Sequence, residues 1–278
     1  MTETTQVVLS AQEVTVEFGL GHGKTLRAVD GVSFDLHAGE VIGIVGESGS
    51  GKSTLGKVLA GFLNPTSGQV QFRAADGGLR ARHQRGPHGF RDVQMIFQES
   101  AMALNPRLPV WRLVGEAVSP NLITFPASGR RRVDTLRDEV ATHLQHAGLD
   151  PAAMAGKRVA ELSGGEKQRV AIARALAASP VAMVCDESVS ALDVTIRAAV
   201  LNLFQRLSRD MGVALVFITH DISVVAHLAD RVAVMYHGQL VELDTPARVI
   251  EDPQHEYTRR LIAAVPTLEQ RPLLSDAR

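Results

Sequence analysis

Residues 41–54 read VIGIVGESGSGKST: five residues of an apolar run, a glycine-rich turn and the opening of a helical pattern. The turn and helix start, GESGSGKST at 46–54, contain the pattern G-x-x-x-x-G-K-[ST] in the strand–turn–helix setting that gives it meaning. Its glycines let successive backbone N–H groups close around an anion, and the helix N-terminus adds partial positive charge. The stretch therefore predicts a phosphate-binding loop for a nucleoside triphosphate.

Side chains at the end of this loop have separate predicted tasks. Lys52 would reach the β- and γ-phosphates, Ser53 would ligate Mg²⁺, and Thr54 would hydrogen-bond phosphate. The predicted phosphate contacts are Gly46, Glu47, Ser48, Gly49, Ser50, Gly51, Lys52, Ser53 and Thr54.

Composition narrows the classes of protein to which this chain can belong. Among 278 residues, 29 Lys and Arg oppose 30 Asp and Glu, a net charge of −1, which argues against bulk electrostatic binding of nucleic acid. A single cysteine, Cys185, excludes an intramolecular disulfide framework, and it is expected to be a buried apolar residue. No apolar run approaches the roughly 20 residues of a membrane-spanning helix, and the opening MTETTQVVLS is unlike a secretory signal.

Strand-like and helical segments alternate along the chain, which predicts an α/β core with a largely parallel sheet. The predicted strands are Val14–Phe18, Val32–Leu36, Val41–Val45, Val93–Phe97, Val181–Cys185, Ala214–Ile218 and Val232–Met235. The predicted helices of the core are Lys52–Ala60, Glu166–Ala178 and Val194–Arg209.

Two stretches depart from this alternation. Asp76–Phe90 is rich in Gly and Arg without periodicity, and is expected to be a surface loop. From about Glu99 to Leu162 the pattern is mainly helical, with helices at Trp111–Val118 and Arg130–Gly148, which predicts an inserted helical lobe. The three arginines 130–132 favour a solvated face, with a partner contact as the alternative.

The run VAMVCDE at 181–187 is an apolar strand that ends in two carboxylates. Such a pair alone is typical of a solvated strand end. Beside a phosphate-binding loop, Asp186 is instead expected to hold magnesium through water, and Glu187 to orient and polarise the attacking water.

The octet LSGGEKQR at 162–169 resembles the signature sequence of ATP-binding-cassette (ABC) ATPases. The resemblance implies that Ser163, Gly164 and Gly165 bind the γ-phosphate of ATP held by an opposing subunit. It also implies a glutamine-loop residue at Gln98 that contacts magnesium and water, a dimer-crossing loop at 190–193 that includes Asp193, and a switch histidine at His220. Phe18 stands where the family has an adenine-stacking aromatic; an ordinary core phenylalanine is the alternative.

The resemblance implies a fold and a set of domains. The expected fold is α/β: a P-loop NTPase (RecA-like) ABC ATPase core with an antiparallel β subdomain and an inserted helical subdomain. The core would comprise residues 1–98 and 163–278, with a C-terminal extension from about residue 245, and the helical subdomain residues 99–162.

The resemblance also implies a site for ATP and Mg²⁺. The catalytic residues would be Glu187, His220, Gln98 and Lys52, and the magnesium ligands Ser53, Gln98 and Asp186. ATP would contact Phe18, the loop 46–54, Gln98 and His220, and, from the second subunit, Ser163, Gly164, Gly165 and Asp193.

Further stretches resemble the ATPase subunits of dipeptide, oligopeptide and nickel importers: MIFQESAMALNP at 95–106, CDESVSALDVTIRA at 185–198 and HEYTRRLIAAVP at 255–266. Ser188 replaces the proline common after the catalytic glutamate, and no four-cysteine cluster is present, so no iron–sulfur centre is expected. The implied partners are a second ATPase subunit, identical or different, two transmembrane permease subunits and an extracytoplasmic solute-binding protein. The implied location is the cytoplasmic face of the membrane.

Several alternatives remain at this point. The solute could be a peptide, nickel or another small solute; the spacing of His143 and His146 does not argue for nickel. An ABC ATPase of DNA repair or translation is disfavoured, because the chain lacks long coiled-coil insertions and a second cassette. A P-loop kinase is opposed by LSGGEKQR and His220, and a purely regulatory subunit by the complete set of catalytic positions.

Overall fold

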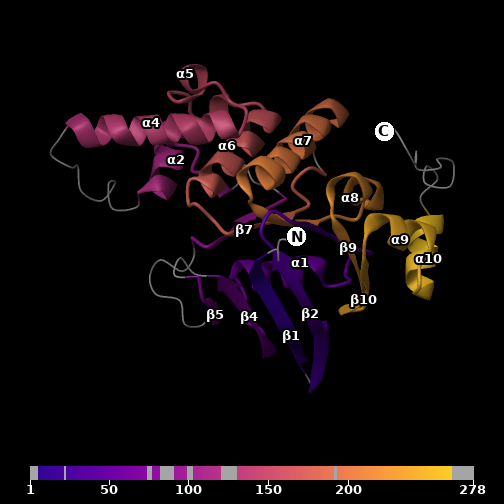
Figure 1. Cartoon of the computed structure of the whole chain (residues 1–278). Helices are drawn as coiled ribbons and strands as arrows, with labels where there is room; N and C mark the ends of the chain where they lie inside the picture. Colours follow the sequence, from indigo (N-terminus) through magenta and orange to yellow (C-terminus); the bar gives the residue numbers. More distant parts are fainter. Residues whose placement is uncertain are drawn as a thin grey trace.

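The chain folds around two β-sheets, seen together in the computed structural model of Figure 1. The structure describes residues 6–21, 23–73, 77–81, 91–98, 103–119, 130–190 and 193–264, with the backbone alone at 130–133. The larger sheet has the strand order β10-β9-β3-β8-β7-β6. Its strands are β3 (Val41–Val45), β6 (Val93–Ile96), β7 (Ala182–Asp186), β8 (Ala214–Ile218), β9 (Arg231–Tyr236) and β10 (Gln239–Asp244).

The larger sheet is parallel except at its β10 edge, as the apolar strands predict. Alternate residues of the strands enter two separate cores. Val41 and Val45 of β3 lie in one core, whereas Ile42 and Ile44 lie in the other. One core packs against α1 (Lys52–Ala60) and the other against α6 (Gly164–Leu176) and α7 (Val194–Met211). Burial on both faces therefore fixes this sheet in the middle of the fold.

The smaller sheet is antiparallel and has the order β2-β1-β4-β5. It lies on the α1 side of the larger sheet (Figure 1) and packs its inner face, including Leu9 and Phe34, into the α1 core. Its strands are β1 (Val7–Gly21), β2 (Lys24–His37), β4 (Ser67–Arg73) and β5 (Leu79–Ala81). This sheet corresponds to the expected antiparallel β subdomain.

Part of the expected surface loop 76–90 is a strand, so that expectation is wrong for residues 79–81. Leu79, Arg80 and Ala81 pair with Arg73, Phe72 and Gln71 of β4. A three-residue edge strand takes its backbone hydrogen bonds from its neighbour, so it shows little side-chain periodicity in the sequence. Residues 76 and 82–90 lie outside the described residues.

At the top of Figure 1, α6 and the helices that precede it in the chain form a layer. Its members are α2 (Val110–Val118), α4 (Arg130–His146), α5 (Pro151–Met154) and the 3₁₀ helix η3 (Val159–Glu161). The predicted helices at 111–118 and 130–148 are thus confirmed. Leu113, Val140 and Val170 join one apolar cluster, so α6 packs with this layer as well as with the sheet. Among the described residues, no helix combines the length and apolarity needed to span a bilayer.

The described residues end beside β9 and β10, at the opposite edge of the larger sheet from β6. Two short helices follow β10 and lie beside β9 and β10 in Figure 1. They are α9 (Pro246–Glu251) and α10 (Glu256–Ala263), which form the end of the described chain. A further helix, α8 (Ile222–Leu228), connects β8 to β9 and packs on β3.

Candidate active site

The phosphate-loop sequence forms the turn between β3 and α1, as predicted. Two of its glycines are required by close approaches of other strands. A Cβ added at Gly51, where φ is 103°, would lie 2.1 Å from the carbonyl oxygen of Ala28, and one at Gly46 would lie 2.2 Å from that of Met235. The loop is therefore seated between β2 and β9 in a shape that side chains at these positions would prevent.

The N-terminus of α1 is open for an anion. Its N-cap, Gly51, supplies no side-chain cap, and the first turn of the helix carries no acidic residue. The unsatisfied N–H groups of a first turn, together with the positive end of the helix dipole, attract phosphate. The geometry is that of an anion site built from the backbone.

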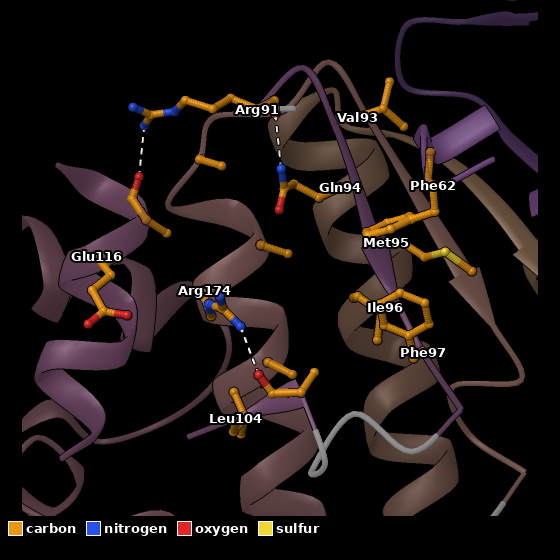
Figure 2. A pocket seen from close by; sticks show the side chains of 16 residues that line it. Phe62, Arg91, Val93, Gln94, Met95, Ile96, Phe97, Leu104, Glu116 and Arg174 are labelled. Carbon is orange, nitrogen blue, oxygen red and sulfur yellow. Dashed lines mark hydrogen bonds between the residues drawn. The ribbon is translucent and has the colours of Figure 1, made fainter. Parts of the chain in front are cut away.

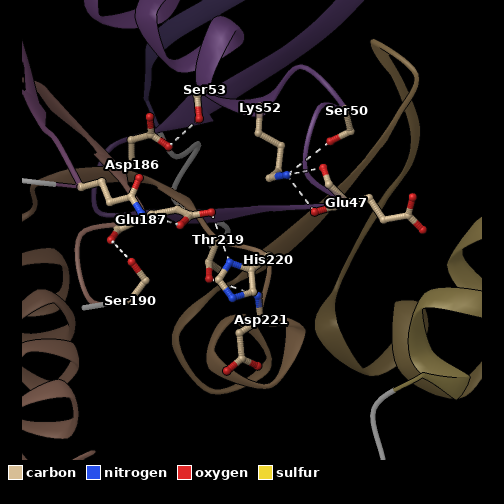
Figure 3. A network of polar contacts seen from close by, with 12 residues as sticks. Glu47, Ser50, Lys52, Ser53, Asp186, Glu187, Ser190, Thr219, His220 and Asp221 are labelled. Carbon is tan, nitrogen blue, oxygen red and sulfur yellow. Dashed lines mark hydrogen bonds and ion pairs between the residues drawn. The ribbon is translucent and has the colours of Figure 1, made fainter. Parts of the chain in front are cut away.

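Lys52 points back into the loop rather than toward solvent (Figure 3). Its Nζ donates to the carbonyl oxygens of Gly46 and Glu47, each at 2.7 Å, and to Ser50 Oγ at 3.3 Å. Lys52 is buried, and burial lowers its pKa, although Glu187, Asp186 and Glu47 oppose the change. The ammonium group therefore sits in the centre of the loop, where a phosphate oxygen would replace one of these three acceptors.

Ser53 and Asp186 meet at the C-terminal edge of the larger sheet, although 133 residues separate them in sequence. Ser53 Oγ donates to Asp186 Oδ1 at 3.0 Å, as Figure 3 shows. Asp186 is 8% exposed, and burial raises the pKa of its carboxyl group against the opposing effect of the Ser53 hydrogen bond. A buried carboxylate beside a hydroxyl supplies the hard oxygen ligands that Mg²⁺ prefers.

Glu187 follows β7 in a backbone conformation that side chains rarely adopt, with φ at 45°. Two contacts hold it: its N–H donates to the carbonyl of Ile218 at 2.9 Å, and Ser190 donates to its carbonyl from both N–H and Oγ. The conformation directs the carboxylate toward two other segments. Strain retained by such contacts is common at functional sites.

Gln98 and His220 reach the two oxygens of the Glu187 carboxylate. Gln98 Nε2 donates to Oε2 at 3.2 Å, and His220 Nδ1 lies 3.2 Å from Oε1. Gln98 follows the end of β6, and His220 follows the end of β8. These two strands lie on either side of β7 in the sheet. The structure thus brings together three residues that the sequence predicted separately.

The signature residues form the start of α6 and do not join this cluster. Ser163 is the N-cap of α6: its Oγ accepts the Glu166 N–H at 3.2 Å, and Glu166 Oε2 accepts the Ser163 N–H at 2.7 Å. Gly165 packs against Ile196. Asp193 caps α7 by accepting the Ile196 N–H at 2.9 Å. Among the described residues, no hydrogen bond or ion pair joins Ser163–Gly165 or Asp193 to the loop 46–54; Ala191 and Leu192 lie outside the described residues.

Phe18 lies on β1 opposite Leu26 of β2. Its side chain is 39% exposed, so the alternative of an ordinary core phenylalanine is wrong. Two residues along β2 from Leu26 is Ala28, which approaches Gly51. Phe18 is thus an exposed aromatic residue opposite the strand that approaches the loop.

Two contacts to the loop come from segments that motif spacing did not indicate. The Glu47 N–H donates to the hydroxyl of Tyr257 at 2.8 Å, and the Gly238 N–H donates to the Ser50 carbonyl at 3.0 Å. These pairs are far apart in sequence, and no single-sequence pattern joins them. The only signal was that Tyr257 belongs to the conspicuous segment HEYTRRL at 255–261.

A pocket of about 490 Å³ opens between β6 and the helical layer (Figure 2). Two arginines form hydrogen bonds between residues that line the pocket: Arg91 Nη2 donates to the Ala117 carbonyl at 2.8 Å, and Arg174 Nη1 donates to the Ala103 carbonyl at 3.1 Å. The residues that line it are mainly apolar, among them Phe62, Met95, Ile96, Phe97, Leu104 and Ala171. Phe97 immediately precedes Gln98, so this pocket adjoins the cluster at Glu187.

Comparisons with known proteins identify the family of this chain. The sequence profile described as ABC transporter matches residues 29–190. The oligopeptide transport ATP-binding protein OppF of Salmonella typhimurium is 43% identical over 95% of this chain and 79% of its own length. The glutathione import ATP-binding protein GsiA of Shigella flexneri is 40% identical over 97% of this chain and 44% of its own.

Solved structures give the same result for the fold. The cbiO1 protein of Clostridium perfringens, part of an ABC transporter complex, has a TM-score of 0.72 and 26% identity over 89% of this chain and 92% of its own. The ATP-binding cassette MJ0796, solved as a dimer in a post-hydrolysis state with ADP and Pi, has a TM-score of 0.68 and 26% identity over 86% of this chain and 98% of its own.

This chain belongs to the ABC transporter family. Its fold is the P-loop ABC ATPase core, and it binds ATP and hydrolyses it in a reaction coupled to transport.

Proposed function

We propose that this chain energises the import of peptides through separate membrane subunits. The observation that carries the proposal is the similarity, along nearly the whole chain, to proteins named for oligopeptide transport and glutathione import. Both names denote peptide cargo. The chain itself would contribute the ATPase cycle, while selection of the peptide would belong to its partners.

In this proposal the loop 46–54 holds the triphosphate. The N–H groups at the start of α1 and the buried ammonium of Lys52 would surround the β- and γ-phosphates, with Thr54 as a further hydrogen-bond donor. The exposed ring of Phe18 would stack on adenine. These contacts supply binding without covalent chemistry, which suits phosphoryl transfer.

Ser53 and Asp186, with Gln98, would hold Mg²⁺. The fit rests on the 3.0 Å contact between a hydroxyl and a buried carboxylate whose pKa burial raises, because a divalent cation would satisfy that charge. When bound, Mg²⁺ neutralises charge on the phosphates.

Glu187 would position the attacking water and accept its proton. Gln98 and His220 occupy one carboxylate oxygen each, so the carboxylate is oriented before water arrives. His220 is exposed on its other side, where it would contact the γ-phosphate. The geometry supports catalysis by positioning and electrostatic stabilisation.

A second ABC subunit, identical or different, would complete each site. Ser163 and Gly164 are exposed at the start of α6, Gly165 beside them is buried, and Asp193 is exposed at the start of α7. Within the described part of the chain, none of these residues has a hydrogen bond or ion pair to the loop 46–54. We infer that they face the ATP of the opposing subunit. The solved MJ0796 cassette is a dimer, which supports this arrangement. ATP would favour closure because these contacts exist only in the closed state.

Two permease subunits would receive this motion at the cytoplasmic face of the membrane, and an extracytoplasmic protein would deliver the peptide. The apolar pocket beside Phe97 is suited to a short helix of a permease subunit, because it adjoins Gln98 on one side and the helical layer on the other. We propose two subdomains. The helical subdomain, residues 99–162, would transmit this motion, and the core would comprise residues 1–98 and 163–278, with an extension from about residue 245.

Reconstitution with the membrane subunits tests the proposal. ATP hydrolysis should rise when a peptide-loaded binding protein is added outside, and labelled peptide should accumulate inside the vesicles. A nickel importer would instead respond to a nickel-loaded binding protein. Stimulation by nickel alone, or hydrolysis indifferent to every binding protein, would contradict the assignment to peptide import.

A further inference from the structure

The C-terminal helix α10 makes one direct hydrogen bond to the phosphate loop. Tyr257, near the start of α10, is 2% exposed, and its hydroxyl oxygen accepts the Glu47 N–H at 2.8 Å. We propose that Tyr257 is a positioning residue for ATP binding, which sets the loop through this N–H without touching the nucleotide. The inference rests on the proposed role of the loop 46–54 as the triphosphate site.

The peptide unit between Gly46 and Glu47 carries the effect. Its N–H donates to Tyr257, and its carbonyl, on Gly46, accepts Lys52 Nζ at 2.7 Å. In a trans peptide these two groups point in opposite directions, so Tyr257 lies outside the loop and Lys52 inside it. A hydrogen bond at one end of a peptide both orients the group and strengthens the bond at the other end. Tyr257 therefore acts on the ammonium group expected to meet the β- and γ-phosphates.

The tyrosine is itself held in place. Its ring stacks on Tyr236 of β9, with centroids 4.1 Å apart and planes 23° apart. Its backbone N–H donates to His255 Nδ1 at 3.1 Å, and the Glu242 carboxylate accepts the N–H groups of Gln254 and His255. Burial raises the pKa of Tyr257, so the hydroxyl stays protonated at neutral pH. The Tyr257 side chain therefore has few accessible rotamers, as a positioning role requires.

A second contact from the same part of the chain holds the other side of the loop. Gly238, in the turn between β9 and β10, donates its N–H to the Ser50 carbonyl at 3.0 Å and accepts the Asp30 N–H at 2.9 Å. The loop is thus fixed at Glu47 by α10 and at Ser50 by the β9–β10 turn. Because Gly238 acts through its backbone, Tyr257 is the contact that a single side-chain change can remove.

The test removes the hydroxyl and keeps the ring. Tyr257→Phe should raise Kd and KM for ATP roughly fivefold, the usual effect of one lost hydrogen bond, while kcat stays within twofold. Tyr236→Phe is the matched control, because it removes a hydroxyl from the stacked neighbour and leaves Glu47 untouched; its ATP affinity should equal that of the original protein. A purely structural role for Tyr257 would lower kcat through loss of active protein and leave KM unchanged, which would overturn the proposal.

Hydrogen exchange of the unaltered protein gives an independent measurement. Without nucleotide, the Glu47 amide should exchange slowly, and fast exchange at that amide would contradict the proposed anchor. Lys52→Ala separates this inference from the proposed function. If Lys52→Ala abolishes ATP binding and Tyr257→Phe has no effect, only the inference about Tyr257 fails. If Lys52→Ala binds ATP normally, the proposed triphosphate site fails first.

Discussion

His220 Nδ1 lies 3.2 Å from Oε1 of Glu187, across the C-terminal edge of the central sheet. The contact joins the ends of β8 and β7, which are neighbours in the sheet order but 33 residues apart in sequence. Glu187 holds a left-handed backbone conformation at this point, and His220 is more than half exposed. One side of the carboxylate is therefore fixed by a residue that also faces the space where a γ-phosphate would lie.

Removing this partner should slow the chemical step. In His220→Ala, Glu187 keeps Gln98 but loses the group at Oε1, so we expect kcat to fall about 10²-fold or more with little change in ATP affinity. Steady-state phosphate release and equilibrium ATP binding measure the two quantities. An unchanged kcat would show that His220 has no part in turnover.

The capping box of α6 should give stability that depends on pH. Hydrogen bonds from the Ser163 backbone and side chain lower the pKa of Glu166, so its charged form stabilises the folded state above the ordinary glutamate pKa of about 4.3. Glu166→Gln should lower Tm at pH 7, and the difference from the original protein should be lost as the pH falls below about 4.3 and through the lowered pKa of Glu166 in the folded state. The control is Glu251→Gln, because Glu251 is exposed and its side chain makes no hydrogen bond or ion pair among the described residues. A Tm difference for Glu166→Gln that does not depend on pH would contradict this origin.

Ser188 has a buried hydroxyl without a hydrogen-bond partner among the described residues. Replacing an unpartnered buried polar group by a methyl group removes a desolvation cost, so Ser188→Ala should stabilise the protein by about 1 kcal/mol, or roughly 2–4 °C in Tm.

Ser208 provides the matched comparison. It is equally buried, but its Oγ donates to the Gly39 carbonyl at 2.7 Å. Ser208→Ala should therefore destabilise the protein by about 1–3 kcal/mol, because the carbonyl loses its partner. Thermal unfolding measures the change in Tm for both variants. A change of the same sign in both would contradict the assignment of Ser188 as unpartnered and Ser208 as hydrogen-bonded.

The sequence predicted the central elements well because each has a strong pattern. Lys52–Ala60 and Ala214–Ile218 have the predicted boundaries, and most other core segments agree to within a few residues. Elements with weak patterns were missed. In β4 only Val70 and Phe72 face the core, and α8 is one short helix after His220. The strands β1 and β2 also extend beyond their predicted lengths: backbone pairing continues along both, and in the added part of β1 Val8, Leu9 and Ala11 are buried.

The candidate site was predictable in its parts but not in its contacts. Motifs indicated Ser53, Asp186, Glu187 and His220, and the sheet brings them together because parallel strands end at one edge. The anchor at Tyr257 has no such spacing rule. Its contact with Glu47 depends on the packing of α10 against β9, which a single sequence does not encode as a local pattern.

The most direct test of this account is the substitution of Glu187 by glutamine, measured by single-turnover phosphate release beside equilibrium ATP binding. Glutamine keeps the size of the side chain and an oxygen for Gln98 or His220, but it cannot accept a proton from water. We predict unchanged ATP affinity and a rate of phosphate release lower by at least about 10³-fold. Phosphate release at the original rate would contradict the central claim that Glu187 orients and deprotonates the attacking water.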